Sequence, residues 1–164
     1  METRHIDIKV EVASRLDELE KADRELVMRA QEAAGRAYAP YSQFNVGACL
    51  LLENGEMIEG NNQENASYPC GCCAERTALN YARSKYPGMA VKAIAITAFN
   101  SDGQLNTPIP PCGICRQALL ECEADSGRPV KVIMNGKSLT NIVHSVADLL
   151  PLSFDKTNLN EQNI

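Results

Sequence analysis

Three cysteines and one glutamate, in two short segments, carry the most specific chemistry in this sequence. Cys73 opens the segment Cys-Ala-Glu-Arg, whereas Cys112 and Cys115 form a C-x-x-C pair that follows a proline. Soft cations such as Zn²⁺ bind thiolates, and a catalytic zinc site uses three protein ligands and keeps a fourth position open. The pattern therefore predicts a metal site with Cys73, Cys112 and Cys115 as ligands. Glu75, two residues after the first ligand, is the predicted catalytic acid-base group.

The elements expected around these residues support the ligand assignment. Cys73 should open one helix, and Cys112 and Cys115 should occupy the first turn of another. Helix N-termini lower thiol pKa values because their free N–H groups and partial positive charge stabilise thiolates. Three thiolates leave a zinc site with a net negative charge, so we expect Arg76 to donate hydrogen bonds to sulfur and to offset that charge. A salt bridge elsewhere is the alternative for Arg76.

Two other uses of these cysteines stay open. Cys70 and Cys73 form a second C-x-x-C, and a fourth thiolate would close the zinc site into a structural one. The gap between Cys73 and Cys112 is longer than the roughly 15–20 residues of compact four-cysteine zinc modules. A C-x-x-C pair can also be redox-active. Pro111 and the Cys-Ala-Glu segment favour the open metal site over both.

Composition limits the compartment and the partners. The chain has 164 residues, of which 45% are hydrophobic and 23% are charged, as in a globular protein with one domain. No apolar run has the length of a membrane span, and residues 1–15 lack the apolar core of a signal peptide. The seven cysteines are an odd number, which indicates reduced thiols, so we expect a cytoplasmic protein. We expect no membrane partner, because no apolar run is long enough to span one. The net charge of −5 argues against a nucleic-acid partner and favours a small or neutral molecule.

Hydrophobic periodicity predicts an α/β fold: a three-layer α/β/α sandwich with a mixed sheet of about five strands. Asn-Gly turns should join two antiparallel hairpins, and Asp23 is the expected N-cap of the first long helix. Residues 5–12 alternate between polar and apolar, which fits either a short strand or an arm on the surface. We divide the chain into an N-terminal extension, a catalytic domain and a polar C-terminal tail, over residues 1–22, 23–154 and 155–164.

A ligand-x-Glu segment combined with Pro-Cys-x-x-Cys is the signature of zinc deaminases that act on amino-pyrimidines and amino-purines. Beyond this motif, the sequence resembles the small homotetrameric cytidine deaminases over about residues 23–154. The matching segments are APYSQFNVGA (39–48), NQENASY (62–68), CAERTA (73–78), PCGICRQ (111–117) and LLPLSF (149–154). The resemblance implies hydrolytic deamination of cytidine and deoxycytidine to uridine and deoxyuridine with release of ammonia, in pyrimidine salvage. It also implies one Zn²⁺ per subunit and a homotetramer with shared active sites.

The resemblance also implies roles for residues outside the metal site. Asn62 and Glu64 would hold the ribose hydroxyls, and amide and carboxylate groups suit this task. Phe44 would pack against the base, and the backbone around Ala74 would contact the pyrimidine. Phe154 would reach the base from a neighbouring subunit, and Tyr68 would lie near that subunit contact. Without the resemblance, Phe44 and Phe154 are core aromatics, and Asn62 and Glu64 are polar loop residues.

Two alternative functions stay open. The first is a deaminase of the same build that acts on a cytosine nucleoside antibiotic such as blasticidin S, although Asn62, Glu64 and Phe44 favour the plain nucleoside. The second is a binding module that zinc stabilises and that has no catalytic activity. Turnover of a panel of cytosine compounds separates the three. The role of the extension, residues 1–22, does not follow from the sequence.

Overall fold

The structure is a computed structural model that describes residues 1–160. Four α-helices, three short 3₁₀ helices and seven strands alternate along this part of the chain. In chain order they are β1 (Glu11–Ala13), η1 (Leu16–Glu18), α1 (Lys21–Ala34), β2 (Asn45–Leu52), β3 (Met57–Asn61), η2 (Tyr68–Cys70), α2 (Ala74–Lys85), β4 (Val91–Asn100), β5 (Gly103–Gln104), α3 (Gly113–Ser126), β6 (Lys131–Asn135), β7 (Thr140–Val143), η3 (Ala147–Leu149) and α4 (Lys156–Asn160).

All strands join one mixed sheet. Its order is β1-β7-β6-β4-β2-β3, and β5 pairs with the end of β4. The β4–β6 pair is parallel and every other pair is antiparallel. A parallel pair needs a crossover connection, and α3 supplies it between β4 and β6. This crossover brings the start of α3 to the same side of the sheet as α2.

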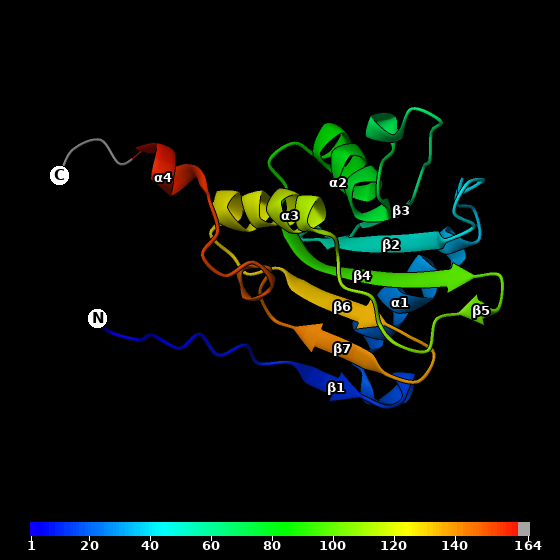
Figure 1. Cartoon of the computed structure of the whole chain (residues 1–164), viewed down its shortest axis with the longest axis horizontal. Coiled ribbons are helices and arrows are strands. Elements are labelled where there is room, and N and C mark those ends of the chain that lie inside the picture. Colours follow the sequence, from blue (N-terminus) through cyan, green and yellow to red (C-terminus); the bar gives the residue numbers. More distant parts are fainter. Residues whose placement is uncertain (161–164) are drawn as a thin grey trace.

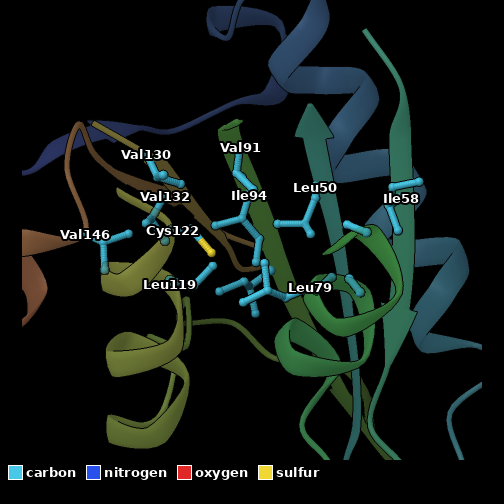
Figure 2. Close-up of a cluster of buried hydrophobic side chains, with 14 of the residues drawn as sticks. Leu50, Ile58, Leu79, Val91, Ile94, Leu119, Cys122, Val130, Val132 and Val146 are labelled. Atoms are coloured by element: carbon cyan, nitrogen blue, oxygen red, sulfur yellow. The ribbon is translucent and has the colours of Figure 1, made fainter. Parts of the chain in front are cut away.

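Helices cover both faces of the sheet, which gives the predicted three layers (Figure 1). One hydrophobic cluster fills the space between the sheet and the pair α2 and α3, and Leu50, Ile94 and Leu119 lie in it (Figure 2). A second cluster lies beneath α1 and includes Leu26, Val27 and Ile133. None of the helices in residues 1–160 is long and apolar enough to cross a membrane.

Two glycines allow the helices to approach the sheet closely. A Cβ atom built on Gly47 would lie 1.9 Å from the carbonyl oxygen of Ala30 in α1. A Cβ atom on Gly60 would lie 2.5 Å from the carbonyl oxygen of Ala74 and 2.5 Å from the nitrogen of Ala78, both in α2. The first turn of α2, which follows Cys73, is therefore pressed directly onto β3.

The α/β class and the order of the predicted elements are confirmed, whereas the strand count and one helix boundary are corrected. The sheet has seven strands because β1 and β5 add to the expected five. Of residues 5–12, only Glu11 and Val12 join a strand, with Ala13, and the preceding residues run as an exposed arm. Asp23 is not the N-cap of α1, which is Glu20. Asp23 is instead buried in the first turn, with its carboxylate 2.7 Å from the Lys131 ammonium.

Candidate metal centre and active-site cleft

The structure brings the three predicted ligand cysteines together. The Sγ atoms of Cys73, Cys112 and Cys115 all lie within 4.8 Å of one another, and those of Cys73 and Cys112 are 3.8 Å apart. Cys73 is the N-cap of α2 and Cys112 is the N-cap of α3. Two helix N-termini therefore meet at the cluster, and both favour negative charge on sulfur.

The protonation of the thiols fits a site for a divalent cation. The pKa of Cys73 is lowered to about 5 by hydrogen bonds from Cys115 and Cys112 and by Arg76. The pKa of Cys115 is raised, because the negative Cys73 sulfur lies beside it and because the side chain is buried. A cation bound beside Cys115 would favour the ionised form of this thiol. Three thiolate donors in this arrangement fit one Zn²⁺, which binds Cys ligands in tetrahedral sites.

Glu75 is the buried acid next to the cluster. Glu75 is only 4% exposed. Burial raises the pKa of its carboxyl group, and the negative charge on Cys73 raises this pKa further. Carboxylates are seldom buried without a partner because desolvation of the charged form is costly. A buried carboxyl group with a raised pKa, in the first turn of α2, is suited to act as an acid as well as a base.

Arg76 lies beside the same cluster. One guanidinium nitrogen donates to the Gly71 carbonyl at 3.3 Å, and its positive charge contributes to the lowered pKa of Cys73. Its Nε atom is buried and has no hydrogen-bond partner within residues 1–160. A buried donor without an acceptor is rare, and thiolate sulfur would supply one. The orphaned Nε atom is a second observation that fits a metal-bound form of the cluster.

Cys70 does not join the cluster. It is the last residue of η2 and is exposed, and the ligand group contains only Cys73, Cys112 and Cys115. A closed site of four thiolates is therefore not formed by the residues that the structure describes. The cluster has three sulfur donors, which leaves one position of a tetrahedron free.

A cleft of about 500 Å³ adjoins the cluster at Cys73. Its volume is within the range of small-molecule sites. Three of the predicted substrate-binding residues line it: Asn62, Glu64 and Tyr68. The sequence analysis gave no substrate role to the other residues that line it, which are Tyr41, Ser42, Gln63, Asn65, Gly71 and Cys72.

Backbone and side-chain hydrogen bonds fix the two polar residues of the cleft. The Asn62 amide donates to the Phe44 carbonyl at 2.9 Å and accepts from the Val46 nitrogen at 2.7 Å. Glu64 accepts hydrogen bonds from the backbone nitrogens of Tyr41 at 2.9 Å and Ser42 at 3.2 Å, and from the Ser42 hydroxyl. The Ser42 hydroxyl and the two backbone donors lower the pKa of Glu64, which therefore stays ionised.

The structure places the remaining predicted residues outside the lining of this cleft. Phe44 lies just before β2, half-buried, and Ala74 is fully buried at the start of α2. Phe154 is 61% exposed, and its carbonyl accepts a hydrogen bond from Gln117 of α3 at 2.9 Å. Tyr68 lines the cleft but is also 78% exposed, so one side of the ring is open. Within one chain, Phe154 is thus free to contact another subunit.

Sequence reasoning missed Tyr41 and Ser42, whose backbone nitrogens hold Glu64. They lie in the segment 39–48, but no property of a tyrosine and a serine reveals that their N–H groups point at a carboxylate. Gln43, the next residue, has a φ of 54°, a left-handed conformation that non-glycine residues seldom adopt. Such local strain is concentrated at functional sites.

A family profile and individual relatives of this chain agree with each other. The profile of the "Cytidine and deoxycytidylate deaminase zinc-binding region" matches residues 20–127. A cytidine deaminase of Halalkalibacterium halodurans is 42% identical over 137 residues, which are 83% of this chain and 96% of that protein. A cytidine deaminase of Sporosarcina psychrophila is 39% identical over 140 residues, covering 82% of this chain and 92% of the other.

Solved structures agree with these relatives. The crystal structure of cytidine deaminase from Burkholderia pseudomallei superposes with a TM-score of 0.68 at 39% identity, over 79% of this chain and 97% of the other. That of Mycobacterium tuberculosis gives a TM-score of 0.62 at 31% identity, over 80% of this chain and 95% of the other. With a profile match over more than half of its length and this near-complete coverage of its relatives, the chain belongs to the cytidine and deoxycytidylate deaminase family.

Proposed function

We propose that this protein is a zinc-dependent cytidine deaminase that converts cytidine and deoxycytidine to uridine and deoxyuridine and releases ammonia. One observation carries the proposal: three thiols converge within 4.8 Å at two helix N-termini, and the buried carboxyl group of Glu75 lies two residues from the first of them. The names of the relatives, which are cytidine deaminases, support the choice of substrate.

In the proposed reaction, Cys73, Cys112 and Cys115 hold one Zn²⁺ per subunit. Bound Zn²⁺ acts as a Lewis acid that makes a water molecule a nucleophile at neutral pH. The buried Arg76 Nε atom, without a partner among residues 1–160, donates to sulfur and offsets the negative charge of the three thiolates.

Glu75 moves the protons. Its carboxylate takes a proton from the attacking water as the water oxygen bonds to the ring carbon that carries the amino group. It delivers this proton to the neighbouring ring nitrogen. It then takes the remaining proton from the newly added hydroxyl group and passes it to the departing amine, so that ammonia leaves and a carbonyl group remains. A single group can serve as base and then as acid because burial raises its pKa above that of an exposed carboxyl group.

The cleft binds the nucleoside. Glu64, held ionised by Ser42 and Tyr41, and Asn62, held by the backbone of β2, bind the sugar hydroxyls. Asn62 uses one amide hydrogen and one carbonyl lone pair for the protein, which leaves one of each for a ligand. Phe44 packs against the base, and the backbone around Ala74 contacts the pyrimidine.

The active sites are shared in a homotetramer. Phe154 is exposed and lies outside the cleft of its own chain, so we assign it to the base of a neighbouring subunit, and Tyr68 to the contact between the two. The protein works in the cytoplasm, in pyrimidine salvage. Seven cysteines without a disulfide support a reducing compartment.

The test follows the ultraviolet absorbance of cytidine during incubation with zinc-loaded enzyme. Glu75→Gln keeps the size of the side chain and removes its acid-base function, so the rate should fall by at least about 10²–10⁴-fold. Zinc content should stay near one per chain. Glu56→Gln, in the exposed turn between β2 and β3, is the matched control and should keep full activity. Near-normal turnover by Glu75→Gln would refute its assigned role. Zinc without turnover of cytidine, but with turnover of blasticidin S, would reassign the substrate.

A further inference from the structure

Residues 5–12 form an arm that the proposed reaction does not use. All eight residues are exposed. Only the end of this N-terminal arm is anchored, where β1 pairs with β7 over residues 11–13. Figure 1 shows the arm as the dark blue trace that leaves β1 and runs out beyond the sheet. The arm also precedes residues 20–127, which match the family profile.

Apolar and polar residues alternate along the arm. Ala13 packs in the cluster beneath α1, and side chains alternate along a strand, so Val12 in β1 faces the opposite side. If the arm extends β1 as a strand, its other even-numbered residues share the face of Val12. Those residues are apolar and exposed to between 42% and 60%: Ile6, Ile8, Val10 and Val12. β1 is also the edge of the sheet, because no other strand of residues 1–160 covers its outer side. An exposed edge with an apolar row is a template for another strand.

We infer that the N-terminal arm pairs antiparallel with the same arm of a second copy of this chain, across a two-fold axis at Ile8. The polar residues of the arm support this register, because basic and acidic side chains alternate among them: His5, Asp7, Lys9 and Glu11. In the register centred on Ile8, each polar residue between positions 5 and 11 faces one of opposite or complementary character, and each apolar residue there faces an apolar one. Val12 faces Arg4 of the second copy, at the end of the paired segment. The facing pairs are His5 with Glu11, Ile6 with Val10, Asp7 with Lys9, and Ile8 with Ile8.

Neighbouring registers lack this complementarity. A two-fold axis at Asp7 places the two Asp7 carboxylates opposite each other, and one at Lys9 does the same to the two ammonium groups. Parallel pairing in register sets every charge against its own copy. Like charges directly opposite are destabilising in a sheet, and opposite charges are stabilising. An axis at Val10 also sets Lys9 against Glu11, but it places Asp7 opposite Ala13 and leaves that carboxylate without a partner. The register centred on Ile8 is therefore the one that gives both Asp7 and Glu11 a partner, in an isologous contact between two copies.

Contacts within one chain leave room for this pairing. The Lys9 ammonium lies 2.7 Å from a Glu11 oxygen, and the other Glu11 oxygen lies 3.0 Å from His144 Nε2. An ammonium group has three donors, so Lys9 keeps donors for Asp7 of the second copy. Asp7 forms no ion pair within residues 1–160, and the two-fold contact would supply one.

A position-specific crosslink tests the pairing. In zinc-loaded, full-length Ile8→Cys protein the two introduced thiols face each other directly, within reach of a disulfide. In Ile6→Cys protein, each introduced thiol faces Val10, and its copy lies four residues away, about 13 Å along the strand. With oxidised glutathione, the peptide pair joined at position 8 should form at least about tenfold faster than the pair joined at position 6. Mass spectrometry separates both from products of the native cysteines.

Charge reversal tests the register. Lys9→Glu added to Ile8→Cys sets a carboxylate against Asp7 twice per pair, and the crosslinking rate should fall at least about tenfold. The exchange Asp7→Lys with Lys9→Asp restores opposite charges and should restore the rate. Cytidine turnover should be unchanged in all these variants, because the arm lies outside the cleft and the metal cluster.

Two results would overturn the pairing. One is a crosslink at position 6 as fast as that at position 8, which would mean contact without this register. The other is a crosslink at position 8 that does not respond to the charge variants, which would mean random collision. Neither result affects the proposed reaction, because activity is measured separately.

Discussion

Cys73 and Cys115 belong to one cluster, yet their thiol pKa values are shifted in opposite directions. Cys73 has a pKa of about 5 and is ionised at neutral pH, whereas the pKa of Cys115 is raised by the neighbouring negative sulfur and by burial. A metal that binds both sulfurs must therefore displace a proton from Cys115. The metal therefore competes with a proton at Cys115, although Cys73 is already a thiolate.

The pH dependence of zinc binding follows from this difference. Because Cys115 is protonated in the metal-free protein at neutral pH and ionised in the metal-bound form, zinc affinity should rise as pH rises. The expected slope is about tenfold per pH unit for each proton released. Competition with a chelator of known affinity, repeated from pH 6 to pH 8, measures it. An affinity that does not change with pH would contradict a protonated Cys115 in the metal-free protein.

Arg76 should support the ligands rather than the substrate. Arg76→Ala removes the positive charge beside Cys73 and the buried Nε donor, so zinc affinity should fall by about 10–100-fold. Arg76→Lys keeps the charge without the planar set of donors and should recover only part of the loss. Zinc release to the same chelator reports the effect. Unchanged zinc affinity in Arg76→Ala, with full turnover, would assign the residue to an ordinary ion pair.

At the scale of elements, the close packing of α2 on β3 sets the position of Cys73. Gly60→Ala would place a methyl group 2.5 Å from the Ala74 carbonyl, so the first turn of α2 must move. We expect a loss of about 1–3 kcal/mol in the free energy of unfolding, as for other overpacked sites, together with a lower zinc content. Urea unfolding and metal analysis of the purified protein measure both.

Gly113 offers a matched control for that variant. It is the first residue of α3, directly after Cys112, and a Cβ atom there has no heavy atom within 4 Å. Gly113→Ala should keep normal zinc content and should stabilise the helix by about 0.5–1 kcal/mol, because alanine is the better helix former. Equal damage from the two substitutions would show that the site tolerates no change at either helix start, regardless of packing.

The order of helices and strands along the chain could be predicted because it depends on local sequence patterns. Apolar periodicity located α1 to α3, and Asn-Gly located the turns after β2 and β6. β5 was missed because two residues, Gly103 and Gln104, carry no periodicity. Asp23 looked like a helix cap, but its carboxylate pairs with Lys131, which is 108 residues away in the chain. Interactions at that distance are not encoded in local propensity.

The metal site was more predictable than the cleft, for a chemical reason. The ligands can be recognised from residue type and spacing alone: Cys73, Cys112 and Cys115. Few tasks other than metal binding need three thiols beside a carboxyl group. The cleft walls are built largely by the backbone, as where Tyr41 and Ser42 hold Glu64. Any residue provides a backbone N–H group, so residue types do not reveal which ones are used.

At the scale of the whole molecule, a shared active site predicts complementation between defective subunits. Phe154→Ala should raise the KM for cytidine, because the base loses an aromatic contact. When it is mixed with inactive Glu75→Gln subunits and the assembly is reformed, a fraction of sites combines Glu75 of one chain with Phe154 of another. Those sites should regain low-KM turnover. If Phe154 serves the site of its own chain, the mixture will show only the turnover of the Phe154→Ala subunits.

The crossover through α3 also has a consequence for how the protein matures. Cys73 stands before β4, and Cys112 and Cys115 stand after it, so the three sulfurs can meet only after the start of α3 has been synthesised. A partly synthesised chain that ends before α3 offers a cation a single ligand of the three. Uptake of a metal by all three sulfurs is therefore a late event in the synthesis of the chain, because it requires everything from α1 to the start of α3. Truncated chains that end before Cys112 would hold no zinc at this site.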